Sequence, residues 1–289
     1  MTSHRNPIFV EDAEVIEHQA FPAAQYMLRL QAPQCAATAR PGQFVHLQCD
    51  PQLPLRRPLS VLRAERDSGR IDVLYKVVGK GTALLSQRRP GETVSLLGPV
   101  GNGFTFDPGR PLKLLLGGGV GMPPMIFLAD RLRSASDLKA FVILGSEVPF
   151  PFHPRPSRFH FAGLPEAVTA AMPLLEDWGV PSRLTSLQGY PGCFEGYVTE
   201  FAAAWLDRLE ADARAGVEVF ACGPEPMLEA VKAMVSRYAL PCQLSLEEYM
   251  ACGVGGCAGC VVEVQTAAGP VMRRVCVDGP VFSAQELSS

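Results

Sequence analysis

A run of cysteines near the C-terminus constrains this chain more than any other feature. Cys252, Cys257, Cys260 and Cys276 are separated by four, two and fifteen residues. The first two spacings match the cysteine run of plant-type 2Fe-2S ferredoxins. Four of the six residues between the first three cysteines are glycine, which reaches positive φ without steric cost and lets the backbone curl around a two-iron core. We therefore expect these four thiols to hold a 2Fe-2S cluster.

Two alternatives to an iron-sulfur cluster remain open for these cysteines. A structural zinc site would be expected to take two Cys-x2-Cys pairs, whereas this segment has one such pair and two single cysteines. The four residues could also be ordinary buried cysteines. For the isolated Cys35, Cys49, Cys193 and Cys242, burial is the favoured interpretation. Nine cysteines in a chain without an export signal argue against a disulfide scaffold.

Length and charge bound the remaining possibilities. At roughly 150 residues per domain, the 289 residues predict about two domains. With 19% charged residues and a net charge of -3, the chain lacks the basic excess that nucleic acid or an anionic membrane surface would attract. Its apolar runs fall far short of the roughly 20 residues that span a bilayer. The N-terminal residues lack the pattern of a secretory signal, so we expect a cytoplasmic protein.

The first third of the sequence alternates short strands with frequent breakers, which is typical of a small antiparallel β-barrel. A single helical stretch, Thr82–Gln87, follows Gly79 and Gly81 and is expected to cap the barrel. The expected strands are Phe9–Glu17, Gln25–Gln31, Gln43–Gln48, Pro58–Arg63, Ile71–Val78 and Thr93–Leu97.

After Pro108 and Gly109 the pattern changes to apolar strands alternating with helices, which indicates an α/β domain with a parallel sheet covered on both faces. Residues 148–158 contain four prolines and are expected to run as an extended loop. The expected strands are Leu112–Leu116, Ala140–Leu144, Phe159–Ala162, Arg183–Leu187, Val217–Ala221 and Gln243–Leu246, and the expected helices are Gly121–Arg133, Val168–Trp178, Tyr197–Leu209 and Glu225–Tyr238.

Two segments of the barrel suit a flavin. Arg57 at the start of a strand offers a guanidinium to a diphosphate, and Ser60 offers a hydroxyl to the flavin ring. Further on, Gly79 and Gly81 open the short helix, where free amides favour a phosphate. Either segment alone is weak evidence, because Arg57 and its neighbour Arg56 also fit a solvated loop. Together they predict flavin binding.

A glycine-rich loop after an expected strand points to a nucleotide. The loop opens a helix, so a cofactor diphosphate can approach the helix amides. Met122 stands at the third glycine position of the strict dinucleotide fingerprint, and a tight turn without a ligand is the alternative. Glu147 follows the next strand, where a carboxylate binds ribose hydroxyls and repels a 2'-phosphate, which favours NAD over NADP. The expected residues are Gly117, Gly118, Gly119, Gly121, Glu147, Cys222 and Gly223; for Cys222, simple burial at a turn accounts for its position nearly as well.

The order of these segments resembles the ferredoxin reductase superfamily and, within it, the type B dihydroorotate dehydrogenase electron transfer subunits. The resemblance covers nearly the whole chain, including the tail Asp278–Phe282 after the last cysteine. Two features depart from the family pattern. Leu59 stands where ferredoxin reductases usually have a tyrosine, and the region 149–195 is longer and richer in proline than we expect of the family. The resemblance implies FAD contacts by Arg57, Pro58, Leu59, Ser60, Leu74, Tyr75, Lys76, Gly81 and Thr82, and cluster ligation by Cys252, Cys257, Cys260 and Cys276.

These parts together suggest an electron relay. Nicotinamide moves two electrons as hydride and a 2Fe-2S cluster takes one at a time, while FAD does both. We assign no catalytic acid or base. The barrel, the nucleotide domain and the cluster segment use up the length, which leaves no room for a further domain that oxidises an organic substrate. A partner must therefore do that chemistry. The resemblance implies that it is an FMN-containing dihydroorotate dehydrogenase catalytic subunit, joined to this chain in a heterotetramer and acting in pyrimidine biosynthesis.

We accordingly divide the chain into an FAD-binding barrel over 1–108, an NAD-binding α/β domain over 109–247 and a 2Fe-2S segment over 248–289. Two rival interpretations remain. The chain could be the flavin and iron-sulfur subunit of another NAD(P)H-linked complex, such as a hydrogenase, sulfide or ferredoxin oxidoreductase. From a different class, it could be a non-catalytic redox sensor or a zinc-bearing interaction module.

Overall fold

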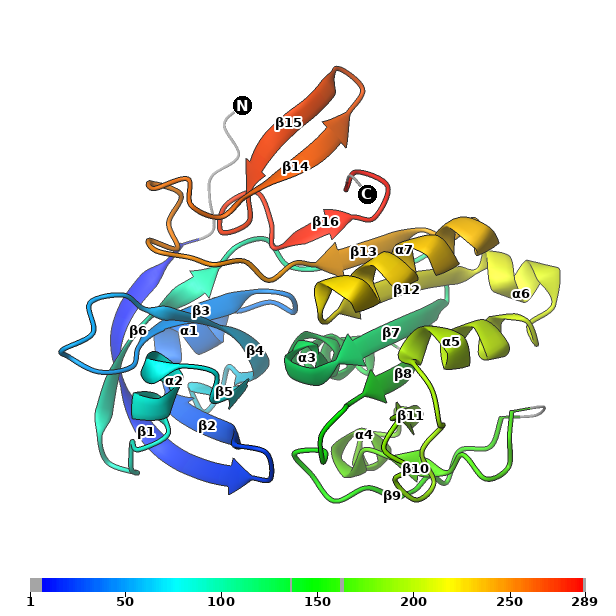
Figure 1. The fold of residues 1–289 in the computed structure, drawn as a ribbon, viewed down its shortest axis with the longest axis horizontal. Coiled ribbons are helices and arrows are strands. Elements are labelled where there is room, and N and C mark those ends of the chain that lie inside the picture. The colour runs from blue at the N-terminus through cyan, green and yellow to red at the C-terminus, as the bar shows by residue number, and fades with distance from the viewer. Residues whose placement is uncertain (1–6, 136, 162–163, 288–289) are drawn as a thin grey trace.

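The chain begins with a closed barrel of six antiparallel strands, seen at the left of Figure 1. This computed structural model describes residues 7–135, 137–161 and 164–287. Alternate side chains along the strands point inward, and Val15, Leu30, Val45 and Val73 are among those that fill the interior. All six expected strands are confirmed. In barrel order they are β1 (Phe9–Phe21), β2 (Gln25–Gln31), β5 (Arg70–Lys76), β4 (Arg57–Glu65), β3 (Phe44–Gln48) and β6 (Thr93–Val100).

Two short helices accompany the barrel, although the sequence predicts one. The expected helix is α2 (Lys80–Leu85), and the additional helix is α1 (Pro33–Thr38). Glu11 on β1 accepts hydrogen bonds from the first amides of α1, at 3.0 Å from Gln34 N and 2.9 Å from Cys35 N. Because this cap comes from a distant strand, the local sequence around α1 carries little helical signal.

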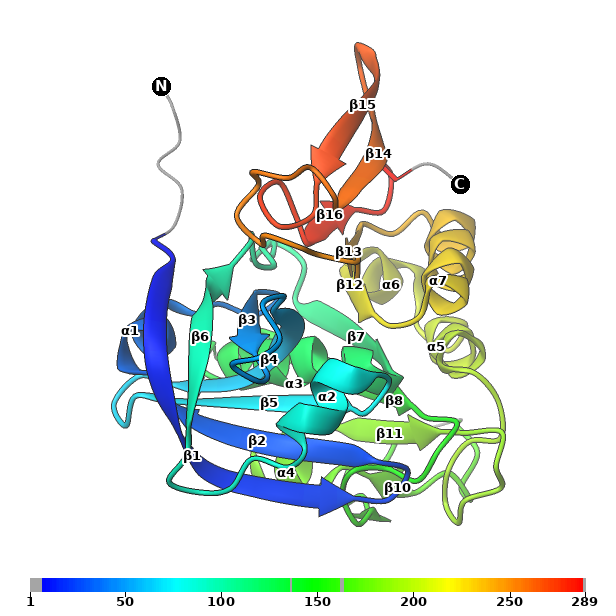
Figure 2. The same cartoon turned by 60° about the vertical axis from the view of Figure 1, so that its left-hand side comes forward.

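A six-stranded sheet with helices on both faces follows the barrel. Its order is β11-β8-β7-β12-β13-β16, and only β16 runs antiparallel to its neighbour. Helix α3 lies between the sheet and the barrel, whereas α5 and α7 pack on the other face (Figures 1 and 2). The bounds are β7 (Leu112–Gly118), the 3-10 turn η1 (Gly119–Gly121), α3 (Met122–Leu132), β8 (Lys139–Gly145), β11 (Ser182–Thr185), α5 (Val198–Leu206), α6 (Ala211–Ala215), β12 (Val217–Cys222), α7 (Glu225–Tyr238) and β13 (Cys242–Ser245).

The proline-rich region between β8 and β11 departs from the expected strand over Phe159–Ala162. Residues 159–161 form no strand, and Ala162 lies outside the described residues. Phe161 instead covers the sheet from a loop, with its ring centroid 4.5 Å from that of Phe141. The apolar Phe161 that suggested a strand therefore packs on the core from a loop.

The helix expected over Val168–Trp178 is also wrong in its first half. The structure has a short strand, β10 (Ala170–Ala171), paired with β9 (Arg155–Pro156), and only then α4 (Pro173–Asp177). Pro173 is suited to the first position of a helix and not to its interior, so the helix begins there. The β9 pairing also means that the stretch 148–158 is not entirely without regular hydrogen bonds.

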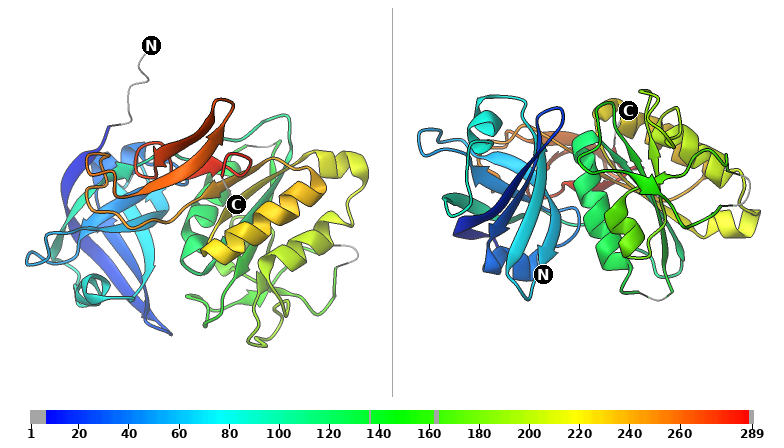
Figure 3. Two further views of the ribbon diagram at one scale, coloured as in Figure 1. Left: turned by 45° about the horizontal axis from the view of Figure 1, so that its top comes forward. Right: turned by 90° about the horizontal axis from the view of Figure 1, so that it is seen from below.

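The C-terminal segment packs on both other parts of the molecule. Strands β14 (Val261–Thr266) and β15 (Gly269–Arg274) form a projecting hairpin, and β16 (Val281–Ser283) then pairs with β13 (Figure 3). Strand β13 is therefore not at the edge of the sheet, because a strand from the end of the chain extends the sheet beyond it. Between β13 and β14 the chain crosses to the barrel side (Figure 1). No helix in the described ranges is both long and apolar enough to cross a membrane.

Candidate flavin, nucleotide and cluster sites

The cysteine loop, residues 247–260, brings the expected cluster ligands together in pairs. Cys252 interacts with Cys257, and Cys276, which follows β15, interacts with Cys260. Cys260 and Cys276 are buried in a small apolar cluster, whereas Cys252 is half-buried and Cys257 is exposed. One pair of thiols therefore faces the protein interior and the other lies near the surface.

This paired arrangement fits a two-iron core, because each iron of a 2Fe-2S cluster takes two of the four thiolates. A structural zinc ion needs its ligands gathered around one point. Within the part of the chain that the structure describes, no three His, Cys, Asp or Glu side chains gather in that way. Four thiols, three from one loop and one from the end of the neighbouring strand, are the donor set that a 2Fe-2S cluster takes.

The loop backbone is shaped for thiolates. Gly253 and Gly255 have φ of +65° and +83°, a region that favours glycine, and they turn neighbouring amides towards sulfur. The amide of Val254 donates to Cys252 Sγ at 3.4 Å. Burial raises the pKa of the Cys252 thiol, but hydrogen bonds from backbone amides and from Cys257 outweigh it and lower the pKa to about 6. The thiolate, which is the form that binds metal, is thus favoured at this position.

Two contacts hold the cysteine loop and its flank in place. Arg274 Nη1 donates to the carbonyl of Gly255 at 3.2 Å, which ties the loop to the end of β15. Asn102, in the linker between barrel and sheet, donates through Nδ2 to the carbonyls of Val277 and Asp278 at 3.0 and 3.1 Å. Cys276, an expected ligand, therefore lies beside a segment that is bound to the linker between barrel and sheet.

The two segments expected to bind FAD meet on the outer surface of the barrel. Arg57 at the start of β4 reaches across to the first turn of α2, where a β-carbon on Gly81 would lie 2.7 Å from Arg57 Nε. Only a glycine allows the guanidinium to lie this close to the helix. Arg57 Nη1 donates to the carbonyl of Leu55 at 2.9 Å, which helps to orient the side chain. The structure thus brings together two segments that lie more than 20 residues apart in sequence.

Not every expected FAD residue points outward. Leu59 belongs to the barrel interior, and Tyr75 is 2% exposed with its hydroxyl 2.9 Å from His18 Nε2. Burial also raises the pKa of Tyr75 well above its ordinary range. Thr82 Oγ1 accepts hydrogen bonds from the amides of Val78 and Gly79, so it caps its own turn. These three side chains shape the site from within, and only their backbone is free to face a cofactor.

The nucleotide residues expected from the sequence converge at the carboxyl edge of the sheet. Gly117 on β7 pairs with Cys222 on β12, so the two strands end side by side. A β-carbon on Gly121 would lie 2.5 Å from the amide nitrogen of Gly223 and closer still to the Cys222 carbonyl. In open parallel sheets this edge is where ligands bind. Gly118 is the last residue of β7, and Gly119 begins the turn η1 that contains Gly121.

Glu147 and Cys222 differ in what they offer at this edge. Glu147 is exposed, two residues beyond the end of β8. The Cys222 side chain is fully buried in the core between the sheet and α3, and burial raises its pKa well above the ordinary value. The carboxylate of Glu147 therefore faces solvent, whereas the Cys222 thiol is enclosed in the core.

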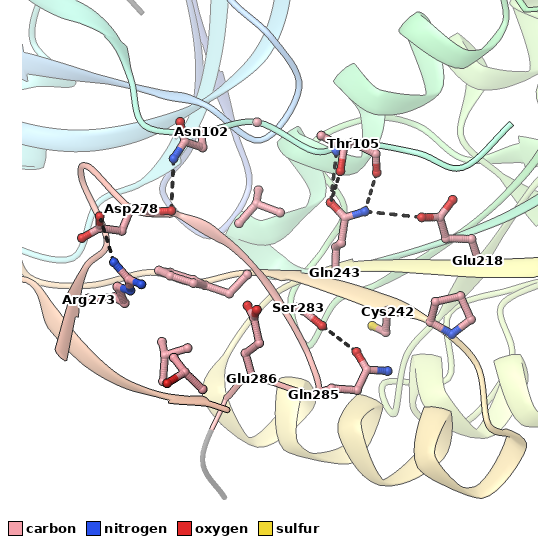
Figure 4. Close-up of a pocket in the computed structure, with 16 residues that line it drawn as sticks. Asn102, Thr105, Glu218, Cys242, Gln243, Arg273, Asp278, Ser283, Gln285 and Glu286 are labelled. Carbon is pink, nitrogen blue, oxygen red and sulfur yellow. Dashed lines mark hydrogen bonds and ion pairs between the residues drawn. The ribbon is translucent and has the colours of Figure 1, made fainter. Parts of the chain in front are cut away.

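A pocket of about 660 Å³ lies elsewhere, at the amino ends of β12 and β13 (Figure 4). Asn102 and Thr105 of the linker line one side, and Arg273 of the hairpin lines another. Beneath it Lys113 and Glu218 form a buried ion pair at 2.6 Å. None of the residues expected to bind FAD, nucleotide or cluster lines this pocket.

Sequence reasoning missed one polar residue at the junction of barrel and cysteine loop. His46 on β3 is 0% exposed, and a β-carbon on Gly253 would lie 2.6 Å from His46 Nδ1. A signal was present in the sequence, because a histidine interrupts the otherwise apolar run Phe44–Leu47. Periodicity places it on the outer face of the barrel, but it does not show that the cysteine loop covers that face.

Comparison with known proteins matches the barrel and the C-terminal segment of this chain to two family models. The family model described as oxidoreductase FAD-binding domain matches residues 10–104, and that described as iron-sulfur cluster binding domain of dihydroorotate dehydrogenase B matches residues 247–288. A solved structure of NADH-dependent reduced ferredoxin-NADP oxidoreductase superposes with a TM-score of 0.74 over 96% of this chain and 90% of that one. At 24% identity, this similarity establishes the fold alone.

The barrel and the C-terminal cysteine loop, with the family models that match them, define an oxidoreductase subunit with an FAD-binding domain and an iron-sulfur cluster binding domain. Proteins named dihydroorotate dehydrogenase B (NAD(+)), electron transfer subunit, are 35% identical in Geobacillus sp. (strain WCH70), over 96% of this chain and 98% of the relative, and 37% identical in Bacillus caldolyticus, over 91% and 92%. The chain belongs to the family of dihydroorotate dehydrogenase B electron transfer subunits.

Proposed function

We propose that this chain carries electrons between NAD+ and a catalytic partner that oxidises dihydroorotate, by means of bound FAD and a 2Fe-2S cluster, in pyrimidine biosynthesis. The observation that carries the proposal is the position of the cysteine loop. It packs on β3 at His46, and β3 pairs with β4, where Arg57 begins the FAD segment. The cysteine loop thus contacts the strand next to the one that carries the expected flavin segment.

Bound FAD exchanges hydride with a nicotinamide and single electrons with an iron-sulfur cluster. For the flavin, Arg57 would bind the diphosphate and Ser60, on the outer face of β4, would contact the ring. The close fit of Arg57 over Gly81 supports this assignment. The further FAD-binding residues in the proposal are Pro58, Leu59, Leu74, Tyr75, Lys76, Gly81 and Thr82.

For the nicotinamide cofactor, the glycine turns at the carboxyl edge would admit the diphosphate, and the exposed Glu147 would bind the ribose and disfavour a 2'-phosphate. For the cluster, the paired thiols described above would be the ligands. The proposed nucleotide residues are Gly117, Gly118, Gly119, Gly121, Glu147, Cys222 and Gly223, and the proposed cluster ligands are Cys252, Cys257, Cys260 and Cys276.

The proposal includes an FMN-containing catalytic partner, a heterotetrameric assembly and a cytoplasmic location, where cysteines stay reduced. The names of the relatives, which call them electron transfer subunits, support the partner. The exposed Cys257 also places one thiol pair where a partner could approach. We keep the division into 1–108, 109–247 and 248–289, with the last segment lending β16 to the central sheet.

Anaerobic titration of the purified protein with NADH tests the relay. We expect the flavin and iron-sulfur absorption bands to bleach together, in a protein that contains two iron and two sulfide per chain, as a 2Fe-2S cluster requires. Bleaching of flavin alone would remove the cluster from the path. Addition of the dihydroorotate-oxidising partner should then give NAD+ reduction driven by dihydroorotate. Failure of that step, with the NADH reaction intact, would point to a different NAD-linked complex.

A further inference from the structure

His46 is a buried polar side chain whose ring has no hydrogen-bond partner among the described residues. It is 0% exposed, and neither ring nitrogen makes a hydrogen bond to any residue that the structure describes. A neutral imidazole carries one N–H donor and one acceptor. Leaving a buried polar group unsatisfied costs about 1–3 kcal/mol, so such groups are rare in proteins and point to a missing partner.

The ring faces the cysteine loop. Along β3, Val45 and Leu47 fill the barrel interior, so His46 lies on the outer face beside Phe44. Phe44 packs in the same apolar cluster as Cys260 and Cys276. On the loop side, Gly253 approaches His46 so closely that a β-carbon would lie 2.6 Å from Nδ1.

The surroundings of the ring keep it neutral. Burial and the positive charges of Arg56 and Arg57 lower the pKa of His46 to about 4. Arg56 Nη1 also donates to the His46 carbonyl at 3.2 Å, a contact with the strand backbone that does not involve the ring nitrogens. A neutral ring among cations offers its N–H to an acceptor, and a thiolate or sulfide is such an acceptor.

We propose that His46 donates a hydrogen bond to the sulfur atoms of the cluster and thereby raises its reduction potential. The reduced cluster carries one more negative charge than the oxidised one, so a donor to sulfur stabilises the reduced form more. His46 is a positioning and tuning residue, not a ligand. This inference rests on the proposed function, because it requires that the four thiols bind the cluster.

The test compares His46→Leu, which removes both ring nitrogens, with His46→Gln, which keeps an N–H donor. His18→Leu is the matched control, because it removes an imidazole of the same barrel whose two ring nitrogens already have partners in Arg88 and Tyr75. The readouts are iron and sulfide content, and separate reduction potentials for the cluster, by electron paramagnetic resonance during a redox titration, and for the flavin, by absorbance.

We expect His46→Leu to shift the one-electron equilibrium of the cluster towards the oxidised form about tenfold, which corresponds to 59 mV, with the flavin potential unchanged. His46→Gln should lie closer to the unaltered protein, and His18→Leu should match it. If His46→Leu loses the cluster while His46→Gln keeps it, the need for a donor is supported.

Three results would overturn the proposal. A cluster with unchanged potential in His46→Leu would mean that something other than sulfur satisfies the ring. A shift in the flavin potential alone would assign the imidazole to the flavin. Loss of the cluster in both variants would show that the ring only fills space. By contrast, absence of iron from the unaltered protein would refute the proposed function itself, which the iron analysis reveals before any variant is compared.

Discussion

Replacing Gly121 by alanine tests the close approach of two turns at the carboxyl edge of the sheet. A β-carbon at this position would lie 2.5 Å from the Gly223 amide nitrogen. Non-bonded heavy atoms make favourable contact only from about 3.5 Å, so the turns must separate by about 1 Å. All the atoms concerned are buried, so we expect overpacking to lower the free energy of unfolding by about 1–3 kcal/mol.

The same displacement should disturb the proposed nucleotide site. A misplacement of about 1 Å between reacting groups costs about 100-fold in rate. We therefore expect Gly121→Ala to retain FAD, which binds on the barrel, but to be reduced by NADH about 100-fold more slowly. Anaerobic stopped-flow absorbance of the flavin band measures this rate directly.

Gly119→Ala is the matched variant in the same loop. Gly119 has φ of +54°, but a β-carbon there would meet no atom within 4 Å. It should cost about 1–2 kcal/mol through the left-handed backbone alone and slow the reaction far less. Flavin reduction by Gly121→Ala at the unaltered rate, or an equal loss in both variants, would refute the argument from close approach.

Three further predictions concern the core, the cluster and the nucleotide. Lys113→Met leaves the Glu218 carboxylate buried without its cation and should lower the free energy of unfolding in urea by about 3–5 kcal/mol. Arg155→Ala, at an ion pair exposed on the surface, should lower it by less than about 1 kcal/mol, and equal losses would contradict the prediction. In iron and flavin analysis, Cys276→Ser should lose iron and keep FAD, while Cys242→Ser, at a buried cysteine of β13, should keep both. Iron retained in Cys276→Ser would exclude Cys276 as a ligand. Glu147→Gln should raise the preference for NADPH over NADH about fivefold in steady-state kinetics, because two like charges about 4 Å apart in water repel each other by about 1 kcal/mol. An unchanged preference would place the carboxylate away from the ribose.

The elements that the sequence predicted best are those whose pattern is local. Strand β2 and helix α7 have the expected bounds, because regular alternation marks the strand and a proline and an amphipathic pattern mark the helix. Helix α1 depends on Glu11 from another strand, and the region of α4 depends on the pairing of β9 with β10. Both are tertiary effects that a window of neighbouring residues does not contain.

The candidate sites follow the same division. The cysteine spacing and the glycine turns are local motifs, so their residues could be proposed from the sequence. The sequence also predicted that the parallel strands end at a common edge. The direction of individual side chains could not be predicted: Tyr75 lies in a flavin-type segment but turns into the barrel to meet His18. The importance of His46 depends on a loop that lies more than 200 residues away in sequence.

The return of the chain at its C-terminus explains why three consecutive sequence segments make one connected molecule. The linker between barrel and sheet passes directly under this segment: a β-carbon on Gly101 would lie 2.7 Å from the carbonyl of Gly279, and Asn102 N donates to that carbonyl at 2.6 Å. On the far side of the junction, Arg63 of the barrel lies 3.7 Å from Asp130 of α3 and its guanidinium covers the ring of Trp178. Two sets of contacts thus connect the barrel region with the sheet region. One is made by the C-terminal segment with the linker, and the other by Arg63 with Asp130 and Trp178. Because an electron relay depends on fixed separations between its sites, contacts of the cysteine segment with both the linker and the central sheet would help to keep those separations constant.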